Sequence, residues 1–211
     1  MGESLRRFIR YVQNSEFGTH IFGYILAGLD TEEWYHWSSG SDQLSGYSKP
    51  TIQAFREWLR RKYGSEENLR KAWSKADIRF DDATVPDSRA RRDTADGTFR
   101  KPKSKMDVID FYLFYNELVP DTIKVFSDVI REETRGTKVI GAFYGYMYEF
   151  MGNPEFGHNA LDYYNRIDSL DFIFVTSSYE NRGFGTGGEY LRSPGYSVNL
   201  HGKLWYHDND V

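Results

Sequence analysis

The sequence predicts an α/β fold, in which parallel strands alternate with helices. Four short apolar runs bounded by turn residues have the length of buried strands. They cover residues 20–26, 138–146, 170–178 and 202–210. Between the first three runs lie segments whose apolar residues recur every three to four positions, as on the buried face of a helix. Strands that alternate with helices are joined by crossover connections, which produce a parallel sheet.

The helices of the first half are predicted from their periodicity and their end signals. Residues 3–14 place apolar side chains on one helical face and arginines on the other. Ser48 can cap a helix that has Pro50 in its first turn and Gly64 at its end. A short helix over residues 65–73 is expected to follow.

The longest helical pattern covers residues 107–133. Pro120 falls inside it. Because proline removes a backbone donor and crowds the preceding turn, we expect a kink there, or a break with a restart. Residues 159–166 are predicted to form a short helix, whereas residues 179–201 show no helical pattern.

Residues 76–105 are polar, contain two prolines and are predicted to form a long irregular loop. The basic end of this segment is interleaved with acidic residues, which is typical of a solvated surface and not of a nucleic-acid site. A chain of 211 residues is long enough for one core. We therefore predict a single partial domain over residues 1–211 that includes this loop.

Composition narrows the function classes. The net charge of −4 does not favour a polyanionic partner. The absence of cysteine excludes disulfides and thiolate metal sites. We find no signal-peptide pattern and no apolar stretch near the roughly 18 residues of a membrane span, so the compartment stays open. Aromatic residues make up 17% of the chain, which suits either a core or platforms for sugar rings.

Carboxylates and aromatic side chains gather just after each predicted strand. In parallel sheets the reactive residues lie beyond the carboxyl ends of the strands. These segments are GLDTEEW, YGYMYEF, TSSYENRG and HDND, and they place Glu33, Glu149, Glu180 and Asp208 beside Trp34, Tyr146, Tyr179 and Trp205. Glycoside hydrolysis needs one protonated and one ionised carboxyl group about 5–9 Å apart, which this pattern suits. An apolar wall such as Trp34 would raise the pKa of the acid.

The run FGYILAGLDTEEWYHW resembles the fourth barrel strand of family-42-like glycoside hydrolases, which are β-galactosidase-type (β/α)8 barrels. FREWLRRKYGSEENLRKAW and FYNELVPDTIKVFSDVIREETRGTKVIGAFYGY are similar to the following helices and strand, and SVNLHGKLWYHDND to the strand that carries the nucleophile. The resemblance implies a partial TIM barrel, roughly from helix three to strand seven. Because a closed barrel needs eight strands, we expect the rest of the barrel in missing sequence and an isolated chain that is poorly stable and inactive.

The same resemblance implies a retaining mechanism with Glu33 as the acid/base and Asp208 as the nucleophile. The family pattern has an Asn where this chain has Glu32, so Glu32 is an alternative acid. The family pattern has a Glu where this chain has Asp208. The alternative for Asp208 is therefore that it belongs to an acidic turn after the strand and has no catalytic function. Glu149 is a further carboxylate of the same edge. Residues 30–33 also suit the start of a helix, where acidic side chains meet the positive end of the dipole.

The candidates for contacts with the sugar are Trp34, Tyr144, Tyr146, Tyr179 and Trp205, although aromatic residues in strands also pack in cores. No histidine pair has the spacing of a metal site, and the glycine-rich run 183–188 does not follow a strand directly, so no metal or cofactor is predicted. The expected partner is an oligosaccharide or another glycoside. Two other functions stay open: a non-catalytic carbohydrate-binding barrel, and an α/β enzyme whose carboxylates bind Mg²⁺.

Overall fold

The computed structural model describes residues 2–95, 99–148, 153–178, 183–185 and 191–208. The chain divides into two compact units. Unit 1 contains residues 1–37 and 117–211, and unit 2 contains residues 38–116. That the chain forms a single domain stays a prediction.

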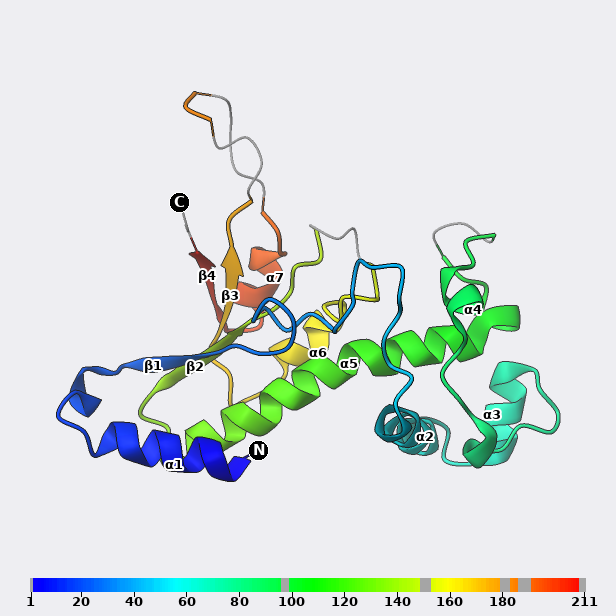
Figure 1. The fold of residues 1–211 in the computed structure, drawn as a ribbon, viewed down its shortest axis with the longest axis horizontal. Helices are drawn as coiled ribbons and strands as arrows, with labels where there is room; N and C mark the ends of the chain where they lie inside the picture. The colour runs from blue at the N-terminus through cyan, green and yellow to red at the C-terminus, as the bar shows by residue number, and fades with distance from the viewer. Residues whose placement is uncertain (1, 96–98, 149–152, 179–182, 186–190, 209–211) are drawn as a thin grey trace. The chain divides into compact units, whose positions relative to one another are not determined.

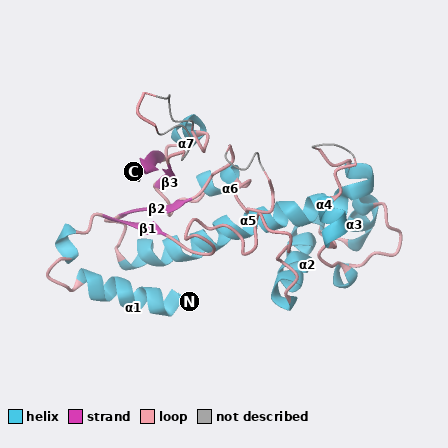
Figure 2. Ribbon diagram, turned by 45° about the horizontal axis from the view of Figure 1, so that its top comes forward, coloured by secondary structure: helices cyan, strands magenta, loops and turns pink. Residues whose placement is uncertain are grey.

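Unit 1 contains a parallel sheet of four strands (Figures 1 and 2). The strands are β1 (Gly23–Leu26), β2 (Val139–Phe143), β3 (Phe172–Thr176) and β4 (Leu204–Asp208). They lie in the order β1-β2-β3-β4, and each neighbouring pair is parallel. The predicted α/β class is therefore confirmed, and consecutive strands as direct neighbours are the arrangement found within a TIM barrel.

Helices cover one face of this sheet. They are α1 (Gly2–Gln13), the part of α5 (Pro102–Glu133) that belongs to unit 1, α6 (Leu161–Asn165) and α7 (Gly195–Leu200), with a short 3-10 turn, η1 (Gly18–His20), after α1. The apolar core between helices and sheet includes Ile9, Ile123, Ile130, Ile140, Ala142, Ile173, Val175 and Val198. The strand register places these sheet residues, together with Trp205 and His207, on the same face.

The opposite face of the sheet, here called the open face, is apolar and partly exposed. Phe143 packs against Phe174 with ring centroids 5.0 Å apart. Ile25, Leu204 and Tyr206 are 46%, 52% and 42% exposed. In a closed barrel this face would be the interior, which is normally filled by side chains.

Two helix predictions are corrected by the structure. Pro120 lies inside α5 with no break, because the φ angle that proline imposes is itself helical; the non-helical residue of α5 is Lys105. The connection between β3 and β4, predicted without a helix, contains α7. This helix has only six residues, and Val198 is its one buried residue with an apolar side chain, so no periodicity could reveal it.

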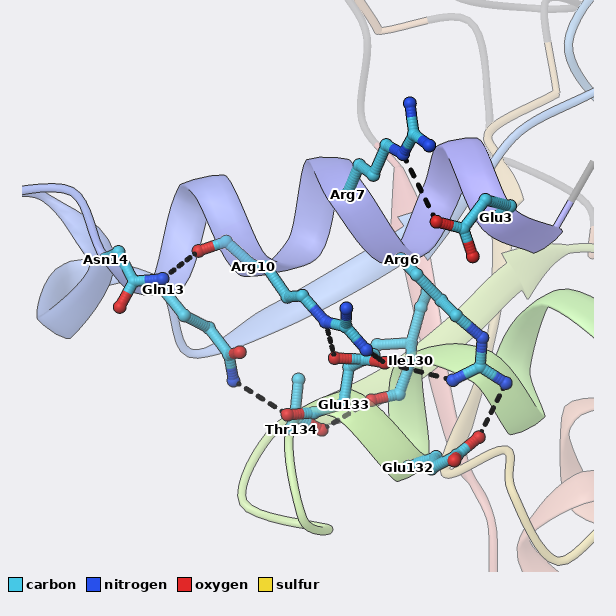
Figure 3. Close-up of polar contacts among 10 residues, drawn as sticks. All are labelled: Glu3, Arg6, Arg7, Arg10, Gln13, Asn14, Ile130, Glu132, Glu133 and Thr134. Atoms are coloured by element: carbon cyan, nitrogen blue, oxygen red, sulfur yellow. Dashed lines mark hydrogen bonds and ion pairs between the residues drawn. The ribbon is translucent and has the colours of Figure 1, made fainter.

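An ion-pair cluster holds α1 against the end of α5 (Figure 3). The Glu133 carboxylate accepts hydrogen bonds from Arg10 at 2.7 and 2.8 Å and from Arg6 at 3.0 Å. Arg6 also pairs with Glu132 at 2.7 Å. The hydrogen bonds from Arg10 and then Arg6 lower the pKa of Glu133 to about 2, so the carboxylate stays charged around neutral pH. The arginines predicted on one face of the first helix thus bind α1 to the end of α5.

Unit 2 is helical. It contains α2 (Lys49–Tyr63), α3 (Glu66–Trp73), the 3-10 turn η2 (Phe80–Asp82), α4 (Ser88–Arg92) and the start of α5. Ser48 caps α2 by accepting a hydrogen bond from the Thr51 amide, and Gly64 ends the helix with a φ of 70°. Both end signals are confirmed. The segment predicted as an irregular loop, 76–105, contains η2 and α4, and α5 begins within it at residue 102.

Candidate active site at the carboxyl edge of the sheet

The loop after β1 is tightly folded. The Gly28 amide donates to the Glu32 carbonyl at 3.0 Å, and the Trp34 amide donates to the Gly28 carbonyl at 2.9 Å. Several of its residues have positive φ angles, namely Leu29, Thr31, Glu32 and Trp34 at 57°, 54°, 66° and 66°. Such a backbone is left-handed at these positions, so the alternative that residues 30–33 start a helix is wrong.

Trp34 anchors this loop in the core. Its side chain is only 3% exposed, and the indole Nε1 donates to the Leu26 carbonyl at 2.9 Å. The ring lies so close to Gly28 that a Cβ on that residue would come within 2.9 Å of it, which explains why glycine is needed there. Trp34 therefore has a packing role in this structure, and its predicted contact with a sugar stays a prediction.

The Glu33 carboxylate is half-buried and faces the ends of the neighbouring strands. Its Oε1 accepts from the Thr176 hydroxyl at 3.4 Å, and its Oε2 accepts from the Thr31 hydroxyl at 3.2 Å. The Tyr146 hydroxyl also interacts with this carboxylate. Burial raises the pKa of Tyr146, and the charge of Glu33 and the hydrogen bond to it raise the pKa further, so the phenol keeps its proton as a donor. Glu32, in contrast, is exposed.

Asp208 ends β4 directly beside the end of β3. The register pairs Thr176 with Asp208, so the two side chains lie on the same face of the sheet. The Ser177 amide and hydroxyl each donate to the Asp208 carbonyl at 2.8 Å, which fixes the backbone here. Neighbouring strands are about 4.8 Å apart. Thr176 thus contacts the Glu33 carboxylate on one side and has Asp208 as its cross-strand neighbour on the other.

The other predicted site residues are distributed differently. Tyr144 is fully buried, and its hydroxyl donates to the Gly157 carbonyl at 3.1 Å. Trp205 lies on the helix-covered face, where its Nε1 donates to the Ser193 hydroxyl at 2.7 Å. Tyr144 is fully buried and Trp205 is half-buried, and both pack in this structure; that they contact a sugar stays a prediction. Tyr179, Glu149 and Glu180 lie outside the described residues.

Sequence reasoning missed three polar residues of this site, which are Thr176, Arg192 and His158. Thr176 ends a strand whose other residues are apolar. It could have been found because it continues the alternate positions Phe172 and Phe174, which lie on the open face of the sheet. Arg192 is 5% exposed and donates to the Thr176 hydroxyl at 2.8 Å. No local pattern marks it, because it reaches the site only through the fold.

His158 lies behind the site and holds two loops together. It is 1% exposed, and its Nδ1 accepts from the backbone amides of Gly145 at 3.2 Å and Tyr146 at 3.3 Å. Its ring also lies close to the carbonyls of Glu33 and Trp34. Burial, and then the nearby His36, lower the pKa of His158 to about 3, so the imidazole stays neutral in the folded protein.

This buried histidine predicts a pH-dependent stability. Its pKa rises from about 3 in the folded protein to an ordinary 6.5 on unfolding, so the unfolded chain binds the extra proton between these values. The contribution of His158 is complete above pH 6.5 and is lost towards pH 3, by at most about 1.4 kcal/mol per pH unit. Urea unfolding of the wild type and of His158→Asn at several pH values measures this loss.

Asparagine cannot titrate, but its side-chain oxygen keeps an acceptor near the position of Nδ1. We expect His158→Asn to be less stable than the wild type at neutral pH, and the difference to shrink as the pH falls below 6.5. Two stability curves that run parallel over this range would contradict the prediction.

Within the described residues, no group of three His, Asp or Glu side chains is arranged to hold a metal ion. Across the same part of the chain, no helix is both long enough and apolar enough to cross a membrane.

A parallel sheet with sequential strands, helices over one face and carboxylates at the carboxyl edge defines the class of (β/α)-barrel proteins. Residues 35–201 match glycoside hydrolase family 42, described as β-galactosidase. The match covers most of the chain, and the chain belongs to this family. It begins just after Glu33 and ends before Asp208.

Two solved structures share the fold. The catalytic domain of β-amylase from Paenibacillus polymyxa has a TM-score of 0.70 and 18% identity, with 100% of this chain and 56% of that chain covered. The β-galactosidase from the psychrophilic Marinomonas ef1 has a TM-score of 0.52 and 20% identity, with 84% of this chain and 24% of that chain covered. This chain thus spans only part of the length of both. No curated protein matches it.

Proposed function

We propose that the protein is a retaining glycoside hydrolase that cleaves β-galactoside-like substrates, with Glu33 as the acid/base and Asp208 as the nucleophile. Membership of family 42 supports the hydrolysis of glycosides. The observation that carries the mechanism is the position of the two carboxylates, one bound to the Thr176 hydroxyl and the other its cross-strand neighbour. Two carboxyl groups on either side of the scissile bond are what this chemistry requires.

The first step would break the glycosidic bond. The Asp208 carboxylate attacks the anomeric carbon while the carboxylic acid of Glu33 gives its proton to the departing oxygen. The alcohol leaves neutral, and the sugar stays bound to Asp208 as an ester. In the second step Glu33, now a carboxylate, takes a proton from water, and the water oxygen attacks the same carbon and releases Asp208.

Completion of the barrel by further strands is part of this proposal. The open face exposes Ile25, Leu204 and Tyr206, and the interior of a (β/α)8 barrel buries such side chains. Further strands on both sides of the sheet would cover them and close the substrate site.

One observation favours a second candidate, a carbohydrate-binding barrel without hydrolase activity. Asp208 has a side chain one methylene shorter than the glutamate of the family pattern. A displacement of about 1 Å at a nucleophile can cost a hundredfold in rate. Sugar binding without turnover would follow if the backbone of β4 does not compensate.

Trapping with a 2-fluoro glycoside separates the two candidates. The electron-withdrawing fluorine slows both steps, so a good leaving group lets the glycosyl-enzyme ester accumulate. In the protein with its barrel completed, we expect mass spectrometry to find one sugar per protein, attached to the peptide that contains Asp208, and we expect no label in Asp208→Ala. Asp210→Ala, which removes the same side-chain type two positions away, serves as the matched control and is expected to label normally.

Retained sugar binding without any covalent label would support the binding barrel. A label on a different carboxylate would show that the nucleophile has been assigned to the wrong residue.

A further inference from the structure

We infer that Arg192 and Thr176 form a hydrogen-bond relay that positions the Glu33 carboxyl group for proton transfer. This inference rests on the proposed function and adds two positioning residues to it. Arg192 donates through Nη1 to the Thr176 hydroxyl at 2.8 Å. The Thr176 hydroxyl in turn donates to Oε1 of Glu33 at 3.4 Å.

The direction of the relay follows from the donor chemistry. A guanidinium group can only donate, so the Thr176 oxygen accepts from Arg192. The hydroxyl has a single hydrogen, and its other close partner in the relay, the carboxylate of Glu33, accepts it. A hydroxyl that accepts from a cation is polarised and becomes a stronger donor.

Burial makes this arrangement rigid. Arg192 is 5% exposed and Thr176 is 7% exposed, so little water competes for either contact. The Arg192 carbonyl also accepts from the Tyr148 amide at 3.0 Å, which ties the segment after β3 to the segment after β2. The Thr176 amide donates to the Tyr146 hydroxyl at 3.3 Å, so Thr176 also holds the tyrosine whose hydroxyl interacts with the Glu33 carboxylate.

The relay helps to fix the orientation of the Glu33 carboxyl group. Thr176 donates to Oε1, and Thr31 donates to Oε2 from the other side. A carboxyl group held in one orientation delivers its proton along one direction, and a small displacement from that direction is costly. Arg192 and Thr176 therefore act through Glu33 and do not themselves need to touch the substrate.

Thr176→Val tests the relay, because valine has the shape of threonine without the hydroxyl. We compare kcat/KM for phenyl and 4-nitrophenyl β-galactosides, since only the poor leaving group, phenol, depends strongly on protonation by the acid. We expect about a tenfold loss with the phenyl substrate and less than about a twofold loss with the nitrophenyl substrate. Thr176→Ser, which restores a hydroxyl, is expected to recover most of the phenyl activity.

A variant that merely disturbs the fold would lower both rates together. Equal losses on the two substrates, or no loss on either, would overturn the relay while leaving the proposed function intact. If Thr176→Val does not fold, Arg192→Lys serves instead, because lysine keeps the positive charge but lacks the planar guanidinium group. The losses of kcat/KM on the phenyl and nitrophenyl substrates are then compared in the same way. These assays use the protein with its barrel completed by the further strands, and a wild type of this form that hydrolyses neither substrate would overturn the proposed function, and the relay with it.

Discussion

Replacing Glu33 by Gln is expected to lower kcat/KM for phenyl β-galactoside by about 10²- to 10⁴-fold. Glutamine fills the same space and keeps one oxygen that can accept from the Thr176 or the Thr31 hydroxyl, but it has no acidic proton to give to a leaving oxygen. Activated 4-nitrophenyl substrates need little protonation. Their kcat/KM should therefore fall much less, and this ratio is the measurement.

Glu32→Gln is the matched control, because it makes the same change at the adjacent position. The Glu32 side chain is exposed, and the Glu32 carbonyl, which the substitution keeps, accepts from the Gly28 amide, so the rates on both substrates should stay close to those of the wild type. If Glu32→Gln reproduced the selective loss and Glu33→Gln did not, the acid would be Glu32. If both variants kept the rates of the wild type, neither Glu32 nor Glu33 would be the acid.

Replacing Asp110 by Asn is expected to destabilise unit 2 by about 3 kcal/mol or more. Asp110 is fully buried and accepts hydrogen bonds from three donors: Lys62 Nζ at 2.6 Å, the Tyr63 hydroxyl at 2.8 Å and Trp73 Nε1 at 2.6 Å. These donors join α2, α3 and α5 within the unit. Asparagine removes the negative charge that faces Lys62 and directs an NH₂ group towards side chains that also donate.

Asp107→Asn provides the comparison in the same helix. Its carboxylate pairs with Lys75 at 2.8 Å, but the Lys75 side chain is 50% exposed, and such pairs contribute at most about 1 kcal/mol. Hydrogen exchange of the amides in α2 and α3 measures the loss within unit 2. Equally small changes in both variants would show that the Asp110 cluster contributes little to stability.

The local features of the fold were predictable because they depend on residues close together in the chain. Ser48 and Gly64 end α2 through side-chain and backbone geometry at the helix ends themselves. The apolar runs predicted all four strands, since a strand covered on one face and filled on the other has few polar positions. Pro120 misled the same reasoning, because a proline within a helix costs a hydrogen bond without necessarily changing the backbone angles.

The candidate site was predictable only in outline. The sequence showed that carboxylates follow the strands, and Glu33 and Asp208 do lie at the carboxyl edge of the sheet. It could not show which aromatic side chains turn into the core. Trp34 and Tyr144 lie in the core, and the loop that carries Trp34 reaches it through several residues with positive φ angles.

The sequence by itself determined the α/β class, the four parallel strands and the presence of carboxylates at one edge, because periodicity and residue type are local properties. Only the tertiary structure decided that Thr176 lies between Glu33 and Asp208, and that Arg192 supports it. The physical reason is that strand register and the return path of the segment after β3 set these contacts. Glu33 and Thr176 are 143 positions apart in the chain, so no spacing pattern could pair them.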